Sequence, residues 1–166
     1  KHQPEGRALA ELGESARIGA IGKKILIIDA MTPTPDRDSG SLDVIFFMKA
    51  FIELGYELTF IPDDLQPLGH YTENLRTLGV RCLTHQDINS IEDFLKQEGR
   101  SFDIDLLYRI QTARLHAPNV RKYAPNEKIV FDTVDLHFLR EERQAVFENS
   151  LEAIDGACDT KDAELD

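Results

Sequence analysis

The feature that most constrains the fold is a regular alternation of short apolar, β-branched runs with segments of helical periodicity. Residues 24–30, Lys-Ile-Leu-Ile-Ile-Asp-Ala, form a mainly apolar, β-branched run, typical of a strand buried on both faces of a parallel sheet. Four further runs are predicted to be strands, at 57–62, 80–84, 102–108 and 128–133. Helices are predicted at 41–54, 71–78, 90–97 and 112–123, the last interrupted near Pro118, and from about 136 onward. The pattern therefore predicts an α/β, three-layer Rossmann-like domain with a mostly parallel sheet of at least five strands.

The ends of the helices and of the domain have recognisable signals. Gly55 and Gly99 are predicted to end their helices, and Ser90 is predicted to cap the start of one. Residues 1–22, with four glycines and weak periodicity, are interpreted as a linker or an inbound helix, and residues 23–166 as the domain. Because the sequence ends in an acidic helical segment rather than in a further strand, we expect the natural protein to continue.

Composition excludes several classes of function. A formal net charge of -11 argues against a nucleic-acid surface or an anionic membrane as the main partner, since both need clustered cations. No apolar run approaches the roughly 20 residues of a membrane span. Cys82 and Cys158 are both expected to be buried, and so few cysteines are ordinary for a reducing compartment. We expect a protein of the cytoplasm, or of the inner face of the membrane.

A first candidate site is the loop before the helix at 41–54. A helix N-terminus offers free N–H groups to a phosphate or a sugar, and Asp38, Ser39, Gly40 and Ser41 lie there. The alternative is that Asp38 or Ser39 only caps the helix and Gly40 serves the turn. The loop has neither the Gly-x-Gly-x-x-Gly pattern nor the Walker lysine, so a standard dinucleotide or ATP site is not expected.

Two further candidates follow strands. Arg109, directly after the run 102–108, is expected at the carboxyl edge of the sheet, where it would bind an anionic group or pair with a structural partner such as Asp132. Asp132, Asp135 and His137 follow the last strand. A carboxylate beside an imidazole can fix its tautomer and orient a sugar hydroxyl, although Asp135 would also serve as an N-cap and His137 as a packed first-turn residue. The histidines are too scattered for a metal site, so no metal is expected.

Some of these residues belong to longer stretches that resemble a known family. They are 28–41, with Thr34-Pro35-Asp36-Arg37-Asp38-Ser39-Gly40-Ser41, then 53–63, 123–126 and 131–143, with Phe131-Asp132-Thr133-Val134-Asp135-Leu136-His137. Over roughly 24–148 the chain resembles the amino-terminal, acceptor-side half of family 4 type glycosyltransferases, which are two-domain GT-B enzymes frequent in polysaccharide assembly.

The resemblance implies a sugar transferase that moves a hexose from a nucleotide-sugar donor to a glycan or lipid-linked acceptor, with retention favoured. The acceptor would bind to this domain, whereas the donor would bind mainly to a carboxyl-terminal GT-B domain absent from this chain. No cofactor is implied for this domain, and the isolated domain would be inactive. Gly40-Ser41 would lie near the donor diphosphate, and His137, oriented with Asp135, near the transferred sugar. Asp38, Ser39, Arg109 and Asp132 would contribute to substrate binding.

Two other classes remain as alternatives. A phosphoacceptor receiver domain has a similar first strand but needs an Asp after strand three and a Lys after strand five. This chain has Cys82-Leu83-Thr84-His85 at the first place and no Lys from 131 to 137 at the second, so that class is disfavoured. A non-catalytic carbohydrate or partner-binding module of a larger assembly protein remains open.

Overall fold

The computed structural model of the chain describes residues 13–17, 19–133, 141, 143–144, 156 and 158–162. In this part of the chain, five strands form one sheet, in the order β3-β2-β1-β4-β5, and every neighbouring pair is parallel. The strands are β1 (Lys24–Asp29), β2 (Glu57–Pro62), β3 (Arg81–Cys82), β4 (Ile104–Tyr108) and β5 (Lys128–Asp132). The helices are α2 (Ser39–Leu54), α3 (Gly69–Thr77), α4 (Ile91–Glu98) and α5 (Ile110–Tyr123), with a short 3-10 helix η1 (Gly99–Ser101). The predicted α/β class and the five strands are confirmed.

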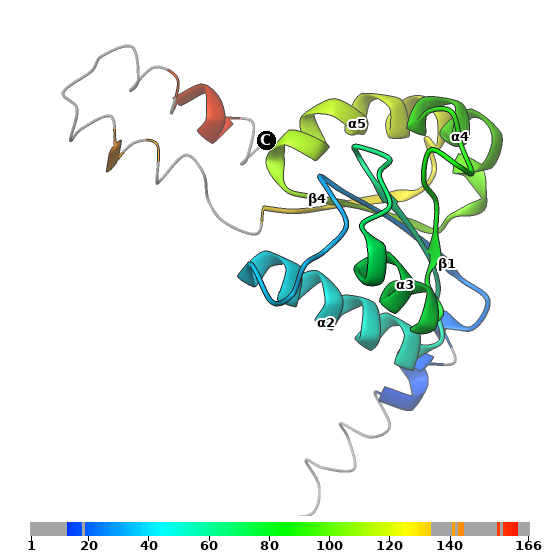
Figure 1. Ribbon diagram of the computed structural model, residues 1–166. Helices are drawn as coiled ribbons and strands as arrows, with labels where there is room; N and C mark the ends of the chain where they lie inside the picture. The colour runs from blue at the N-terminus through cyan, green and yellow to red at the C-terminus, as the bar shows by residue number, and fades with distance from the viewer. Residues whose placement is uncertain are drawn as a thin grey trace, which may run out of the picture.

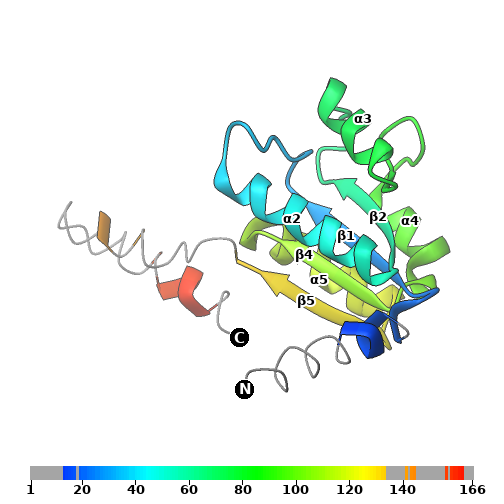
Figure 2. The ribbon, with the colours of Figure 1, turned by 90° about the horizontal axis from the view of Figure 1, so that it is seen from below.

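The sheet is the middle layer of three. Helices α2 and α3 cover one face and α4 and α5 cover the other, while β2, β1, β4 and β5 lie side by side with the same direction (Figures 1 and 2). Alternate residues of β1 therefore enter two cores. Ile25 and Ile27 pack beneath α2 and α3, whereas Leu26 and Ile28 pack beneath α4 and α5. All four are fully buried, which explains the uninterrupted apolar run.

The three predicted helix ends are confirmed. Gly55 follows α2 with a φ of 98°, the left-handed conformation that a glycine adopts without steric cost. Ser90 caps α4, since its hydroxyl accepts a hydrogen bond from the Asp93 N–H at 3.0 Å. Gly99 follows the last residue of α4 with a φ of -50°, so it is not left-handed, and it begins the 3-10 turn η1.

The third strand is shorter than predicted. The run 80–84 suggested five residues, but only Arg81 and Cys82 pair with β2 in the ladder. The N–H of Leu83 still donates to the Phe60 carbonyl of β2 at 2.9 Å. The N–H of Val80 donates to the Leu75 carbonyl at the end of α3, and the N–H of Thr84 donates to the side chain of Asp87. Local hydrogen bonds therefore flank this short strand.

Two other predictions are wrong. Helix α5 runs through Pro118 without a break. Pro118 is exposed, so water can reach the carbonyl that loses its N–H partner, and the helix tolerates the residue there. Cys158 is exposed rather than buried, whereas Cys82 is buried as expected. The helix predicted from about 136 falls mostly outside the described residues. Within the described residues, no helix is both long and apolar enough to cross a membrane.

A carboxyl group lies unpaired inside the sheet. Asp105 in β4 is fully buried, and its ladder partner Leu26 belongs to the core beneath α4 and α5. Neither carboxyl oxygen has a hydrogen-bond partner in the described part of the chain. Burial, together with the nearby charge of Glu127, raises the pKa of Asp105 from 3.8 to about 7.

We therefore predict that Asp105 makes stability depend on pH. Between about pH 4 and about pH 7 the folded protein retains a proton that the unfolded chain has lost, so the free energy of unfolding falls as the pH rises. In Asp105→Asn this dependence disappears. The free energy of unfolding of the variant, relative to the parent, should rise by about 4 kcal/mol across this range in urea titrations followed by circular dichroism.

The exposed Asp43 provides the matched control, because Asp43→Asn removes a carboxylate from the surface. It should change the free energy of unfolding by less than about 0.5 kcal/mol, as surface substitutions usually do. A difference between Asp105→Asn and the parent that does not change with pH would contradict the prediction.

Candidate functional site

The carboxyl edge of the sheet has a point at which the chain changes direction. From β1 the chain passes through α2 to β2 on one side, whereas β4 passes through α5 to β5 on the other. The two helices lie on opposite faces (Figure 1). In open α/β sheets, ligands bind in the crevice outside the carboxyl ends of the strands at such a switch point. The residues that end β1 and follow β4, Asp29 and Arg109, are therefore the first to consider.

Asp29 is a buried carboxylate with a cationic partner. Its side chain is 1% exposed, and Oδ1 accepts hydrogen bonds from Arg109 Nε at 3.0 Å and from the Ala30 N–H at 2.7 Å. Burial outweighs these stabilising contacts and raises the pKa of Asp29 to about 6. Oδ2 has no partner among the described residues. Asp29 can therefore change its protonation state near neutral pH.

Arg109 joins three segments of the edge. Besides its bond to Asp29, the guanidinium of Arg109 donates from Nη2 to Asp38 Oδ1 at 3.2 Å. The backbone N–H of Arg109 donates to the Asp132 carbonyl at 2.8 Å. Its backbone has φ 75° and ψ 145°, a region that residues with a side chain rarely occupy. The sequence interpretation offered Asp132 as a structural partner of Arg109, and the backbone of Arg109 does bond to the Asp132 carbonyl. Asp29 and Asp38 form ion pairs with the Arg109 side chain.

The loop before α2 is built around Asp38. Its side chain accepts hydrogen bonds from the Ser41 N–H at 2.8 Å and from the Ser41 hydroxyl, so Asp38 is the N-cap of α2. Although partial burial opposes the shift, the bonds from Ser41 and Arg109 hold the pKa of Asp38 below its ordinary value. The Ser41 hydroxyl also accepts from the Thr34 N–H at 2.9 Å. This network explains the loop's shape, and Ser39 and Gly40 form the first turn that follows it.

The structure thus brings Asp38, Ser39, Gly40, Ser41 and Arg109 into one neighbourhood, with the backbone of Asp132 beside them. Whether they bind a ligand stays a prediction. Asp135 and His137 lie outside the described residues, so the catalytic role given to them also remains a prediction.

Sequence reasoning missed an important member, Asp29. The available signal was a carboxylate as the last residue of an otherwise apolar strand, since a charge at that position must emerge at the carboxyl edge or find a partner.

A second missed contact joins Asp63, just after β2, to His116 in α5. Asp63 Oδ1 lies 2.6 Å from His116 Nε2, and the histidine is buried. His116 Nδ1 and the hydroxyl of Thr112, one turn earlier in α5, have no partner in the described part of the chain. No local pattern indicates this pair, because 53 positions separate its members. The contact connects the loop after β2 to the layer formed by α4 and α5.

The arrangement is suited to the recognition of polar groups. Among the described residues, no group of three or more His, Cys, Asp or Glu side chains is placed to hold a metal ion. Arg109 is 27% exposed, so N–H groups of its guanidinium remain available to a ligand while Asp29 and Asp38 fix its position. Such a positioned fork can bind a phosphate, a carboxylate or a sugar hydroxyl.

Comparisons of the chain with protein-family models, with curated proteins and with solved structures found no match.

We predict that Arg109 neutralises Asp29. In Arg109→Met the buried carboxylate loses its charged partner, so the free energy of unfolding near pH 8 should fall by about 3 kcal/mol. The loss should be smaller below the Asp29 pKa of about 6, where the carboxyl group takes up a proton. Urea unfolding at both pH values measures the difference.

Arg121→Met is the matched control, since Arg121 is exposed in the last turn of the same helix. It should change the free energy of unfolding by less than about 0.5 kcal/mol. The double variant Asp29→Asn/Arg109→Met should recover most of the lost stability, because no charge is then left buried. An equal loss of stability in Arg109→Met and Arg121→Met would disprove the role assigned to Arg109.

Proposed function

We propose that this chain is the acceptor-side domain of a glycosyltransferase, which transfers a sugar from a nucleotide-sugar donor to a glycan or lipid-linked acceptor in cell-surface polysaccharide assembly. A carboxyl-terminal α/β domain of the same protein would hold the donor, and the reaction would occur in the cleft between the two domains. The enzyme would work in the cytoplasm or at the inner face of the membrane.

The observation that carries the proposal is the position of Arg109. A charged residue occupies a strained backbone conformation at the switch point and is fixed by two carboxylates from different segments. Strain of this kind costs on the order of 1–3 kcal/mol and is concentrated at functional sites. The fold agrees with the amino-terminal half of a GT-B enzyme, although a fold alone does not define an activity.

The chemistry follows from the charges at this edge. The guanidinium of Arg109 would bind an anionic or hydroxyl oxygen of the substrates, and the buried Asp29 would hold the guanidinium in position. In the proposal, His137 and Asp135 orient the hydroxyl nearest the reacting carbon. The donor domain supplies most of the stabilisation of the departing diphosphate, so this domain alone should not catalyse transfer.

The test uses the full-length gene product and a panel of nucleotide sugars. We expect release of nucleoside diphosphate, by transfer to an acceptor or by slow donor hydrolysis, and a loss of at least about tenfold in kcat for His137→Ala. Arg121→Ala, an exposed change outside the site, is the control. A gene product without a second α/β domain, or one that neither transfers nor hydrolyses any donor, would refute the proposal.

His137→Ala also separates the transferase from its alternative, a non-catalytic carbohydrate or partner-binding module. A binding module has no turnover to lose, so the variant would then change affinity alone.

A further inference from the structure

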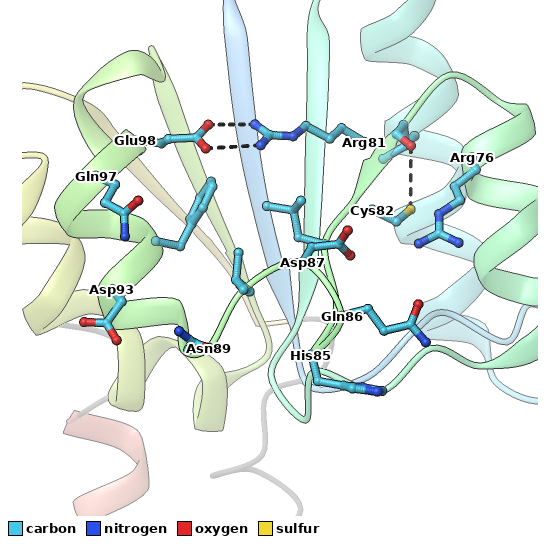
Figure 3. Close-up of a pocket in the computed structure, with 14 residues that line it drawn as sticks. Arg76, Arg81, Cys82, His85, Gln86, Asp87, Asn89, Asp93, Gln97 and Glu98 are labelled. Carbon is cyan, nitrogen blue, oxygen red and sulfur yellow. Dashed lines mark hydrogen bonds and ion pairs between the residues drawn. The ribbon is translucent and has the colours of Figure 1, made fainter.

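A polar groove lies away from the switch point, along the outer edge of the sheet. It is a groove of about 720 Å³ between β3 with the end of α3 on one side and α4 on the other, closed at one end by the loop 85–89. Figure 3 shows Asn89 and Gln97 on the α4 side, and Arg81, Cys82 and Gln86 on the β3 side. None of these residues takes part in the site described above.

The charged groups of the groove are already paired. Arg81 donates from both terminal nitrogens to Glu98 at 2.7 and 3.1 Å, and Arg76 pairs with Glu73 at 2.7 Å. Asp87 accepts from the Thr84 N–H and hydroxyl, and Asp93 pairs with Lys96. An anionic ligand would therefore have to compete with existing ion pairs and would meet several carboxylates.

The neutral groups, in contrast, are available. Gln86, Asn89 and Gln97 are exposed, and their side-chain amides make no hydrogen bond within the described part of the chain. The Nδ1 atom of His85 lies 3.1 Å from the Leu65 carbonyl, which can only accept, so Nδ1 carries the proton and Nε2 of the neutral ring is an acceptor. Each amide offers donors and an acceptor, which is the requirement for binding hydroxyl groups.

Two other kinds of occupant fit less well. A peptide added as a strand needs a row of free backbone groups, but β3 has two ladder residues and the Thr84 N–H is already bonded to Asp87. Covalent chemistry at Cys82 is also disfavoured, because burial raises the pKa of its thiol to about 11.

We propose that this groove binds a neutral carbohydrate chain through the amides of Gln86, Asn89 and Gln97 and the imidazole of His85. Its end at the loop 85–89 lies at the carboxyl edge of the sheet, two strands from β1, which is about 10 Å at the usual strand spacing. In the proposed transferase it holds the part of the acceptor distant from the reacting hydroxyl. That assignment rests on the proposed function, whereas the carbohydrate chemistry of the groove does not.

The test measures binding rather than turnover. The full chain, labelled with ¹⁵N, is titrated with maltohexaose, cellohexaose and chitohexaose, and with an oligogalacturonate as an anionic probe, at millimolar concentrations. We expect at least one neutral probe to shift the side-chain amide resonances of Gln86, Asn89 and Gln97. The double variant Asn89→Ala/Gln97→Ala should weaken that binding by about tenfold or more.

The exposed Asn126, in the turn before β5 and outside the groove, gives the control Asn126→Ala, which should bind as the parent does. The inference is overturned if no neutral probe shifts the three amides, if the anionic probe binds more tightly, or if the double variant binds unchanged. If no probe binds but the full-length protein transfers sugar, the groove does not bind carbohydrate and the proposed function stands. If a probe binds but no sugar is transferred, the carbohydrate groove stands and the proposed function fails.

Discussion

The ion pair between Arg109 and Asp29 is the interaction on which the geometry of the carboxyl edge depends. It joins residues 80 positions apart, at the ends of the two central strands, and it does so where one charge is almost fully buried. Arg109 also contacts Asp38, the cap of α2, and its N–H bonds to the end of β5. One side chain and its backbone thus fix the relative positions of β1, β4, β5 and the start of α2.

Much of the fold could be predicted from the sequence, because its determinants are local. The apolar run of β1 indicates that both faces of the strand are covered. Gly55 adopts the left-handed conformation that ends α2, and the Ser90 hydroxyl accepts the hydrogen bond that caps α4. These signals need no knowledge of the rest of the chain. For the same reason, the pattern predicts the number of strands and the class of the fold.

The remaining features depend on contacts that periodicity does not contain. The path of α5 through Pro118 depends on access to solvent, and the role of Arg109 depends on a carboxylate 80 positions away in the sequence. The sequence correctly predicted that Arg109 lies at the carboxyl edge of the sheet, because the end of a strand is a local signal. It could not identify Asp29 as the partner of Arg109. The pair of Asp63 and the buried His116 was missed for the same reason.

The two edges of the sheet, described above only as strand lengths, differ in how easily the sheet can be extended. At β3 the ladder has two residues, and Asp87 takes the next backbone donor as another strand would. At β5, the other edge within the described part of the chain, the ladder has five residues and Val130 is 46% exposed. An open ladder of that length presents a template of unpaired backbone groups, whereas a short, self-satisfied one does not. Among the described residues, β5 therefore offers a further strand a longer edge than β3 does.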